Sequence, residues 1–345
     1  MRAAYLTAHG GNDVVAIGER PRPARAAGEV LVRIQAATVN RVDLYMRDSG
    51  AGIPHRLPQI MGIDGAGVIA ETDAGMTRLA VGQAVVLHPG VSCGDCEFCL
   101  RGDHVLCTAI RFLGEHRDGT FADYVSLPAK NVFALPPGFS FAEAAALGVA
   151  YLTAWRMLFS KARLEPWESV LVIGIGGGVS LAALQLARAT GARVLVTSRS
   201  DEKLERALAQ GAAVAINGQS QDVVAGVMAA TGGRGVDVVI DSVGREVWPV
   251  ALKSLVRGGR IVTCGATSGD DPAADLRRVF VRQLQIFGST LGNFEEFRAL
   301  MAFCGRHQIK PIIDSRYPLD GVRDALTRLE SVRQFGKIAI EVAGS

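Results

Sequence analysis

The sequence has no long uninterrupted apolar run and almost no excess of charge. Its longest apolar stretch, residues 144–155, includes Thr153 and is shorter than the roughly 20 residues that a membrane-spanning helix needs. The opening residues contain no apolar core of a signal peptide. The net charge of +3 is too small to suggest a nucleic-acid partner. We therefore expect a cytoplasmic protein that binds neither membrane nor nucleic acid.

Internal repeats and low-complexity segments are also absent. The 345 residues exceed what one hydrophobic core usually fills, and the 49% apolar and 21% charged content is ordinary for a globular protein. Residues 1–140 lack a regular strand–helix alternation, and their strand candidates at residues 30–34, 67–70 and 82–87 are punctuated by glycine and proline. Two domains are expected, of which the first is rich in β-strands.

The stretch at residues 169–203 has the pattern of one βαβ unit. Residues 170–173 predict a buried strand, residues 181–189 a helix that Gly191 ends, and residues 194–197 a second strand. A glycine turn that opens a helix suits a pyrophosphate, because the backbone approaches closely and the helix N-terminus offers free N–H groups. The residues predicted to bind there are Gly174, Gly177, Gly178 and Val179.

This glycine turn departs from the usual G-x-G-x-x-G spacing. It has the form Gly174-x-x-Gly177-x-x-Ser180, with Ser180 as the third small residue, where helix and strand pack closely. The alternative is a tight turn in some other α/β protein. The strand before the turn and the helix and strand after it favour nucleotide binding.

Strand candidates continue beyond this unit, with helical patterns between them. They lie at residues 213–216, 236–240, 260–263 and 285–288. The alternation predicts an α/β fold with a parallel, doubly wound sheet, in which the ligand lies at the carboxyl ends of the strands.

Four of the six cysteines fall within fifteen residues, with the spacing C-x2-C-x2-C-x7-C. Thiolates at this spacing can surround a zinc ion, and four of them leave no open position, which indicates a structural site. An iron–sulfur cluster is an alternative that the spacing leaves open. Cys264 and Cys304 are isolated and are expected to be inert and buried. The predicted metal ligands are Cys93, Cys96, Cys99 and Cys107.

Together with this cysteine lobe, several motifs show that the chain resembles the medium-chain dehydrogenase/reductase superfamily of zinc alcohol dehydrogenases and quinone oxidoreductases. The motifs are residues 119–124, 145–155, 237–244 and 258–267. The resemblance implies a GroES-like catalytic domain from residues 1–150 and 288–345, with a structural zinc lobe at about residues 92–108. It also implies a Rossmann dinucleotide-binding domain at residues 151–287.

The chain departs from its zinc-dependent relatives where they hold a catalytic zinc. The first cysteine position carries Asn40, the Gly-His-Glu position has Gly62-Ile63-Asp64, and the third ligand position falls at Val149. Asparagine is a poor zinc ligand, and the apolar side chains cannot ligate. We therefore expect no catalytic metal and no metal polarisation of an alcohol oxygen.

Hydride transfer to an activated acceptor does not need such a metal. A conjugated enone, quinone or enoyl thioester accepts hydride at carbon, and its carbonyl oxygen then needs only hydrogen-bond donors. Asn40 and Tyr45 match an Asn-x-x-Asp-x-Tyr pattern of the family's quinone oxidoreductases and are the predicted catalytic residues. The alternatives are a turn-forming Asn40 and a half-buried Tyr45. Asp43 and Asp64 are equally well explained as hydrogen-bonded turn residues, and no role is assigned to His88 or His116.

The end of the second strand indicates the cofactor. Enzymes that use NAD place an acidic residue there, whereas the family register puts Ser198 at this position, followed by Arg199 and, further on, Lys203. These residues can donate to the 2′-phosphate that NADPH has and NADH lacks, which favours NADPH. In the alternative, nearby acidic residues pair with the two cations. Further cofactor contacts are implied by the resemblance at Ser242, Val243, Gly265, Ala266, Leu291 and Lys337.

The expected function is therefore NADPH-dependent reduction of a small molecule by a homodimer or homotetramer. Two alternatives remain. One is a zinc-type alcohol dehydrogenase acting on alcohols or aldehydes, and the other is an NADPH-binding protein without activity, like the lens crystallins of this family.

Overall fold

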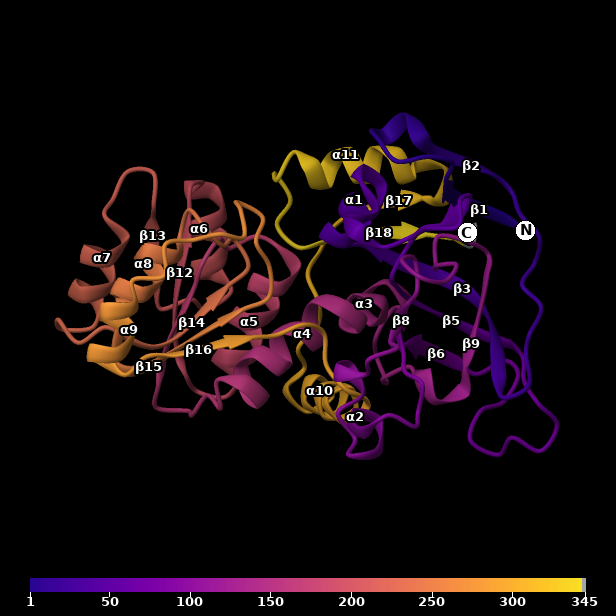
Figure 1. Cartoon of the computed structure of the whole chain (residues 1–345), viewed down its shortest axis with the longest axis horizontal. Helices are drawn as coiled ribbons and strands as arrows, with labels where there is room; N and C mark the ends of the chain where they lie inside the picture. The colour runs from indigo at the N-terminus through magenta and orange to yellow at the C-terminus, as the bar shows by residue number, and fades with distance from the viewer. Residues whose placement is uncertain (343–345) are drawn as a thin grey trace. The chain divides into compact units, whose positions relative to one another are not determined.

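A computed structural model describes residues 1–342 and divides the chain into two compact units (Figure 1). Unit 1 combines Met1–Ala150 with Asn293–Ser345, and unit 2 is Tyr151–Gly292. The sequence-based boundary at residue 288 therefore differs by five residues from the division seen in the structure. Residues 343–345, which the sequence placed in the catalytic domain, lie outside the described residues.

Unit 2 contains a six-stranded sheet in which every pair of neighbouring strands is parallel. The strand order is β13-β12-β11-β14-β15-β16, so the order reverses beside β11. In open sheets of this kind a ligand binds at the carboxyl ends of the strands next to that reversal. The strands are β11 (Ser169–Val172), β12 (Arg193–Ser198), β13 (Val214–Asn217), β14 (Val236–Asp241), β15 (Leu255–Thr263) and β16 (Gln285–Gly288).

Helices lie on the faces of this sheet because its strands are apolar on both sides. Leu171 and Val239 pack in one cluster with Val227 and Trp248, which come from α7 and α8. The alternate residues Val170, Val172, Val194 and Val196 are also fully or almost fully buried and point to the opposite face, by the pleat of a strand. The helices are α4 (Leu152–Trp155), α5 (Gly178–Ala189), α6 (Asp201–Ala209), α7 (Val223–Ala230), α8 (Trp248–Ser254) and α9 (Leu276–Arg282).

Unit 1 is built on a seven-stranded sheet in which most neighbouring strands are antiparallel. Its main path is β10-β6-β5-β3-β18-β17, and β9 also pairs with β3. Two smaller sheets, β2-β1-β4 and β7-β8, complete the unit. Its strands are β1 (Arg2–Leu6), β2 (Val15–Glu19), β3 (Glu29–Val39), β4 (Gln59–Ile60), β5 (Asp64–Glu71), β6 (Ala84–Leu87), β7 (Gly90–Val91), β8 (Arg111–Phe112), β9 (Tyr124–Pro128), β10 (Val132–Ala134), β17 (Ile313–Pro318) and β18 (Lys337–Glu341).

Both ends of the chain contribute to the core of unit 1. Residues from β1 and β3 pack in one cluster with residues of α11 and β18, and Figure 1 shows α11 beside β17 and β18. The β3–β18 pairing places Val39, at the end of β3, opposite Ile338, near the start of β18. The end of one strand and the start of the other therefore lie side by side, although they are far apart in sequence. The helices of this unit are α1 (Arg41–Asp48), α2 (Glu97–Leu100), α3 (Phe141–Ala146), α10 (Phe294–His307) and α11 (Val322–Glu330).

The strand candidates of the sequence all fall inside observed strands or overlap them. The candidate at residues 260–263 is the end of β15, and that at residues 30–34 is the middle of β3. The apolar stretch at residues 144–155 forms short helical segments, and most of its side chains are buried. Among the described residues, no helix combines the length and apolar character needed to cross a membrane.

Candidate functional site

The glycine turn of unit 2 lies between β11 and α5, where the sequence predicts a pyrophosphate site. Gly174 has a φ of +73°, a conformation that other residues rarely adopt, and a Cβ there would lie 3.3 Å from Val243. Gly177 is the N-cap of α5 and, as a glycine, has no side chain that could cap this N-terminus. Gly178 and half-buried Val179 begin the helix, so their N–H groups have no partner within it. A helix start of this kind can bind a phosphate group.

The end of β12 and the start of α6 hold the three residues predicted to select the cofactor. Arg199 is exposed, and the part of the chain that the structure describes offers its guanidinium no partner. The nearby carboxylate of Asp201 instead accepts a hydrogen bond from Asn217 at 2.7 Å. Ser198 accepts from the N–H of Ser200, and Lys203 lies in the first turn of α6. The alternative in which Asp201 neutralises Arg199 is therefore not the arrangement found.

Other predicted cofactor residues lie at the carboxyl ends of the neighbouring strands. Ser242 and Val243 follow β14 directly, and Gly265 and Ala266 follow β15. A Cβ at Gly265 would lie 3.0 Å from the carbonyl oxygen of Ser242, so the two loops touch. Leu291 is buried three residues after β16. The structure thus brings the loops after β11, β14 and β15 to one edge of the sheet.

In unit 1 a buried polar cluster forms at one end of three neighbouring strands, β5, β3 and β18, which lie in the middle of the sheet. Its members are Thr38 and Asn40 from the end of β3, Asp64 from the start of β5 and Lys337 from the start of β18. Thr38 lies directly opposite Asp64 in the sheet. We call these four residues the Lys337 cluster.

Asn40 lies at the centre of the Lys337 cluster, and both the nitrogen and the oxygen of its side-chain amide are hydrogen-bonded. Its Nδ2 donates to Asp64 Oδ2 at 2.8 Å and to the Thr38 carbonyl at 3.0 Å. Its Oδ1 accepts from Lys337 Nζ at 2.5 Å. A primary amide has two N–H donors, so neither remains for a substrate in this arrangement.

The ionic pair of the cluster joins Lys337 to Asp64, whose nearest atoms are 3.8 Å apart. Lys337 Nζ also donates to the Val39 carbonyl at 2.9 Å, and Asp64 accepts two further bonds from the N–H and hydroxyl of Thr38. Burial raises the pKa of Asp64 and lowers the pKa of Lys337, while the charge of each partner opposes the shift in the other. Lys337 is 4% exposed and Asp64 is fully buried.

By the register that the family resemblance implies, the Lys337 cluster includes or adjoins the positions at which a zinc dehydrogenase would hold its catalytic metal. Asn40 occupies one ligand position, and Ile63 adjoins Asp64 at the second. A Cβ at Gly148 would lie 3.2 Å from Asp64, so the third position, Val149, belongs to the same neighbourhood. The donors present are one amide already bonded on both sides and one carboxylate paired with an ammonium group. These residues do not fit a zinc ion.

Asp43 and Glu115 of unit 1 are also buried, and the residues that the structure describes offer their carboxyls no cationic hydrogen-bond partner. Asp43 accepts a bond from the N–H of Asn40 at 2.7 Å, and burial raises its pKa to about 7, with the charge of Asp64 adding to the shift. Burial also raises the pKa of Glu115 to about 7. Both groups therefore titrate near neutral pH, several units above an ordinary carboxyl.

Tyr45 lies on α1, one turn beyond the Lys337 cluster. It is 39% exposed, and partial burial raises the pKa of its hydroxyl. The residues that the structure describes make no hydrogen bond with this hydroxyl. Of the two residues predicted to be catalytic, Tyr45 is therefore the one with a free donor.

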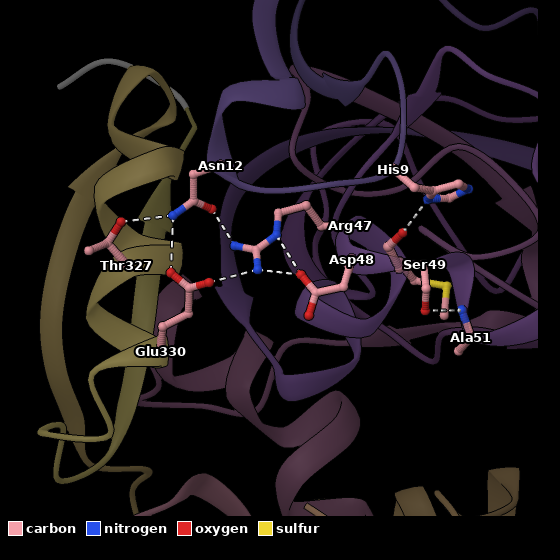
Figure 2. A network of polar contacts seen from close by, with 9 residues as sticks. His9, Asn12, Arg47, Asp48, Ser49, Ala51, Thr327 and Glu330 are labelled. Carbon is pink, nitrogen blue, oxygen red and sulfur yellow. Dashed lines mark hydrogen bonds and ion pairs between the residues drawn. The ribbon is translucent and has the colours of Figure 1, made fainter.

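Arg47 fixes the other end of α1, and Figure 2 shows its guanidinium between Asn12, Asp48 and Glu330. Its Nη2 lies 2.6 Å from Glu330 Oε1, and its Nε donates to Asp48 at 2.9 Å. Asn12 receives a bond from Arg47 and donates to Glu330 at 3.1 Å. Because Glu330 ends α11, this contact ties α1 to the segment that leads to Lys337.

The four cysteines of the lobe converge as their spacing predicts. Their ligand atoms all lie within 4.8 Å of one another. Backbone N–H groups of Cys93 and Cys96 point to sulfur atoms of the same group, at 3.3 and 3.4 Å. Four thiol donors at this separation fit a zinc ion that is held for structural purposes. Cys264 is partly exposed, contrary to the expectation of burial, whereas Cys304 is buried.

Sequence reasoning missed the pairing of Asp64 with Lys337 and the burial of Asp43 and Glu115. A signal was present for the pair, because a charged residue in an apolar strand needs a partner. His88 and His116, left without a role, each accept a backbone N–H at Nδ1, at 3.2 Å. His88 also packs edge-on against Phe294, with 4.7 Å between the ring centres. These contacts account for His88 as a core residue.

Comparisons with known proteins agree with this architecture. Residues 26–137 match the model of the alcohol dehydrogenase GroES-like domain, and residues 178–306 match that of the zinc-binding dehydrogenases. An alcohol dehydrogenase of Geobacillus stearothermophilus is 32% identical, with 94% of this chain and 96% of that protein covered. The quinone oxidoreductase of Rattus norvegicus is 31% identical, with 94% and 92% covered.

Solved structures resemble the whole chain. A crystal structure of an NAD-dependent alcohol dehydrogenase is 40% identical, covers 99% of this chain and 100% of its own, and has a TM-score of 0.96. A 2-octenoyl-CoA carboxylase reductase, solved with NADP and 2-octenoyl-CoA, is 26% identical, covers 99% and 87%, and has a TM-score of 0.90. The chain therefore belongs to the medium-chain dehydrogenase/reductase superfamily and is one of its nicotinamide-dependent oxidoreductases.

Proposed function

We propose that this protein transfers hydride from NADPH to a conjugated enone, a quinone or an enoyl thioester, without a catalytic metal. The observation that carries the proposal is the Lys337 cluster, which fills the neighbourhood of the family's catalytic zinc with an ammonium group and its partners. Similarity to a quinone oxidoreductase and to an enoyl-CoA carboxylase reductase supports this choice of acceptors.

The proposed chemistry depends on an acceptor that is already activated. Hydride adds to carbon, the double bond's electrons move onto the carbonyl oxygen, and a proton from solvent or a side chain later completes the product. The oxygen charge needs a hydrogen-bond donor, and the free hydroxyl of Tyr45 supplies one in our proposal. Asn40, whose own donors are engaged, would act by fixing the start of α1.

We also propose that NADPH is preferred over NADH. Exposed Arg199 has no partner among the described residues, and with Ser198 and Lys203 it would bind the 2′-phosphate. The glycine turn with Gly174, Gly177, Gly178 and Val179 would bind the pyrophosphate. The nicotinamide would lie against Ser242, Val243, Gly265, Ala266 and Leu291.

Replacing Arg199 by alanine tests the cofactor preference. A charged hydrogen bond contributes about 1.5–3 kcal/mol, so we expect NADPH to bind roughly tenfold to a hundredfold more weakly while NADH changes little. Titration calorimetry with both cofactors measures this. The variant Arg193→Ala changes a cation at the opposite end of β12 and serves as the control. Equal affinity of the unaltered protein for the two cofactors would contradict the preference.

A turnover screen together with metal analysis tests the function itself. We expect one zinc per chain, held by Cys93, Cys96, Cys99 and Cys107, and NADPH oxidation with at least one enone, quinone or enoyl-CoA. Two zinc ions and steady oxidation of simple alcohols would instead establish a zinc-type alcohol dehydrogenase, the activity named for several relatives. Tight NADPH binding without any turnover would indicate a binding protein.

The chain is further proposed to form a homodimer or homotetramer through the exposed edge of unit 2. Strand β16 ends the sheet, and α9, which precedes it in the chain and contacts β15, buries none of its residues. The exposed apolar residues there are Leu276, Phe280, Val281 and Ile286. An unpaired apolar edge strand favours pairing with another chain. Because the six cysteines are unpaired, we also propose a reducing, cytoplasmic location.

Light scattering of Phe280→Glu and Ile286→Lys tests this assembly. Both changes place a charge on the apolar edge, so we expect a lower molar mass in solution than for the unaltered protein. Leu208→Glu is the matched control, because Leu208 is exposed on α6 and lies outside this edge. An unchanged mass in both edge variants would remove this surface from the assembly.

A further inference from the structure

The surroundings of Lys337 indicate a role besides the cofactor contact that the resemblance implies for it. Family resemblance placed this lysine at the cofactor, whereas its ammonium group is buried in unit 1. All the partners found for it belong to this unit, namely the Val39 carbonyl, Asn40 Oδ1 and Asp64 Oδ2. An ammonium group has three N–H donors, and three acceptors surround this one.

Its immediate environment combines one cation with one fully buried carboxylate. Asp64 receives bonds from the N–H and hydroxyl of Thr38 and from the amide of Asn40, all between 2.7 and 2.8 Å. These donors are neutral, so Lys337 is the group that balances the carboxylate's charge. A buried charge that loses its partner is strongly destabilising.

The same ammonium group fixes the orientation of the Asn40 amide. Because Lys337 donates to Oδ1, the amide nitrogen must point toward Asp64 and Thr38, and the reversed amide would set donor against donor. Asn40 is the N-cap of α1, the helix that carries Tyr45. The Arg47–Glu330 contact holds the other end of α1 to α11, seven residues before Lys337.

We propose that Lys337 is a positioning residue and the resident cation of this site, in place of the catalytic zinc of related dehydrogenases. Its ammonium group locks Asn40 and balances Asp64, and in this way it sets the start of α1 and the placement of the Tyr45 hydroxyl. The inference rests on the proposed function only for its effect on turnover. The charge balance stands without it.

Four variants separate this role from that of a cofactor ligand. Lys337→Met removes the charge with a side chain of similar length, Lys337→Arg keeps the charge, Asp64→Asn removes the opposite charge, and the double variant Lys337→Met/Asp64→Asn removes both. Lys310→Met is the control, because that side chain is 48% exposed in the same unit. The readouts are melting temperature, NADPH affinity and kcat.

We expect Lys337→Met to melt several degrees lower than the unaltered protein and to bind NADPH within a factor of two. Its melting temperature should fall further as the pH rises, because the unbalanced Asp64 must then ionise. The other charged or titratable groups in this neighbourhood, Asp43 and Glu115, are unchanged in every variant and act as a common background. The double variant should recover much of the lost melting temperature.

Turnover distinguishes positioning from simple charge balance. We expect kcat to drop tenfold or more in Lys337→Met and to stay low in the double variant, since Asn40 still lacks its donor, while Lys337→Arg recovers activity. A tenfold loss of NADPH affinity with an unchanged melting temperature would make Lys337 a cofactor ligand and overturn the inference. Full kcat in the double variant would overturn the positioning role. If no substrate is ever turned over, the melting and affinity measurements still decide the charge balance.

Discussion

At the scale of single residues, neighbouring positions of one short segment take different roles because of burial. Asn40, Asp43 and Tyr45 lie within six residues, and the first two are buried and hydrogen-bonded. Tyr45 is 39% exposed, and its hydroxyl makes no hydrogen bond with the described residues. A donor that is already satisfied adds little to a developing charge. The segment therefore divides into residues that hold its geometry and one that can touch a substrate.

Changing Tyr45 to phenylalanine removes that free hydroxyl. Because the loss of one donor to an oxyanion costs on the order of a hundredfold in rate, we expect kcat to fall by about this factor while NADPH binds normally. Asn40→Ala should slow turnover as well, through the start of α1. Steady-state kinetics with fluorescence titration of NADPH measures both effects, and full activity in both variants would take these residues out of the mechanism.

The buried carboxyl of Asp43 should make stability depend on pH. Its pKa of about 7 lies above the value near 4 of an unfolded chain, so the folded state holds its proton more tightly. The protonated carboxyl stabilises the folded state, and this contribution is fully present below pH 4. It is lost as the pH rises through 7, at up to about 1.4 kcal/mol per pH unit.

Asp43→Asn removes this titration and keeps an oxygen that can accept the N–H of Asn40. Urea unfolding at pH 6, 7 and 8 should show the variant gaining stability relative to the unaltered protein as the pH rises. Taking the difference between the two proteins cancels any effect of pH on the cysteine lobe. A difference that does not change over this range would mean that Asp43 is ionised throughout.

At the scale of elements, contacts between distant segments matter more than the strength of any one helix. Helix α1 has eight residues and would be marginal alone, so its placement depends on the Lys337 cluster at its start and Arg47 near its end. Figure 2 shows that the Arg47 contacts connect three elements, since Asn12 lies in the turn before β2 and Glu330 ends α11.

Arg47→Met tests the connection between α1 and α11. Arg47 is 4% exposed and bonds two carboxylates, so we expect a loss of about 2 kcal/mol in the free energy of unfolding. Arg316→Met is a matched control, because both side chains of the Arg316–Glu341 pair are about half exposed, and such pairs contribute at most about 1 kcal/mol. Equal losses in the two variants, measured by urea unfolding, would argue against the connection.

The elements themselves were largely predictable. The apolar runs of β11, β12 and β14 are buried on both faces, and such runs carry a clear signal in sequence. Gly191 has the positive φ of +98° expected after a helix end, although the C-cap is Thr190. The early part of β15, residues 255–259, was missed because Gly258 and Gly259 interrupt the pattern.

At the scale of the whole molecule, the cysteine lobe is expected to couple metal binding to folding. Its helical elements are α2, with four residues, and a 3-10 helix at His104–Leu106, and helices this short are marginal without further support. A structural zinc ion supplies such stability in small lobes. The lobe lies in unit 1, so its loss should affect that unit first.

Cys99→Ser removes a buried ligand of this set. We expect zinc content to fall well below one ion per chain, with a lower melting temperature and lower solubility. Cys304→Ser, a buried cysteine outside the lobe, should keep its zinc and controls for the substitution itself. Elemental analysis and thermal unfolding check both, and a fully loaded, equally stable Cys99→Ser variant would contradict the assignment.

The sequence by itself determined the parallel sheet of unit 2, the glycine turn and the cysteine lobe. These features depend on residues close together in the chain, where spacing and apolar pattern carry the information. Only the tertiary structure decided the partners of Asn40, Asp64 and Lys337, because β5, β3 and β18 become neighbours through pairing across almost 300 residues. It also decided that Asp43 is buried while Tyr45 is half exposed. Burial and charge pairing arise from packing, so a local pattern cannot fix them.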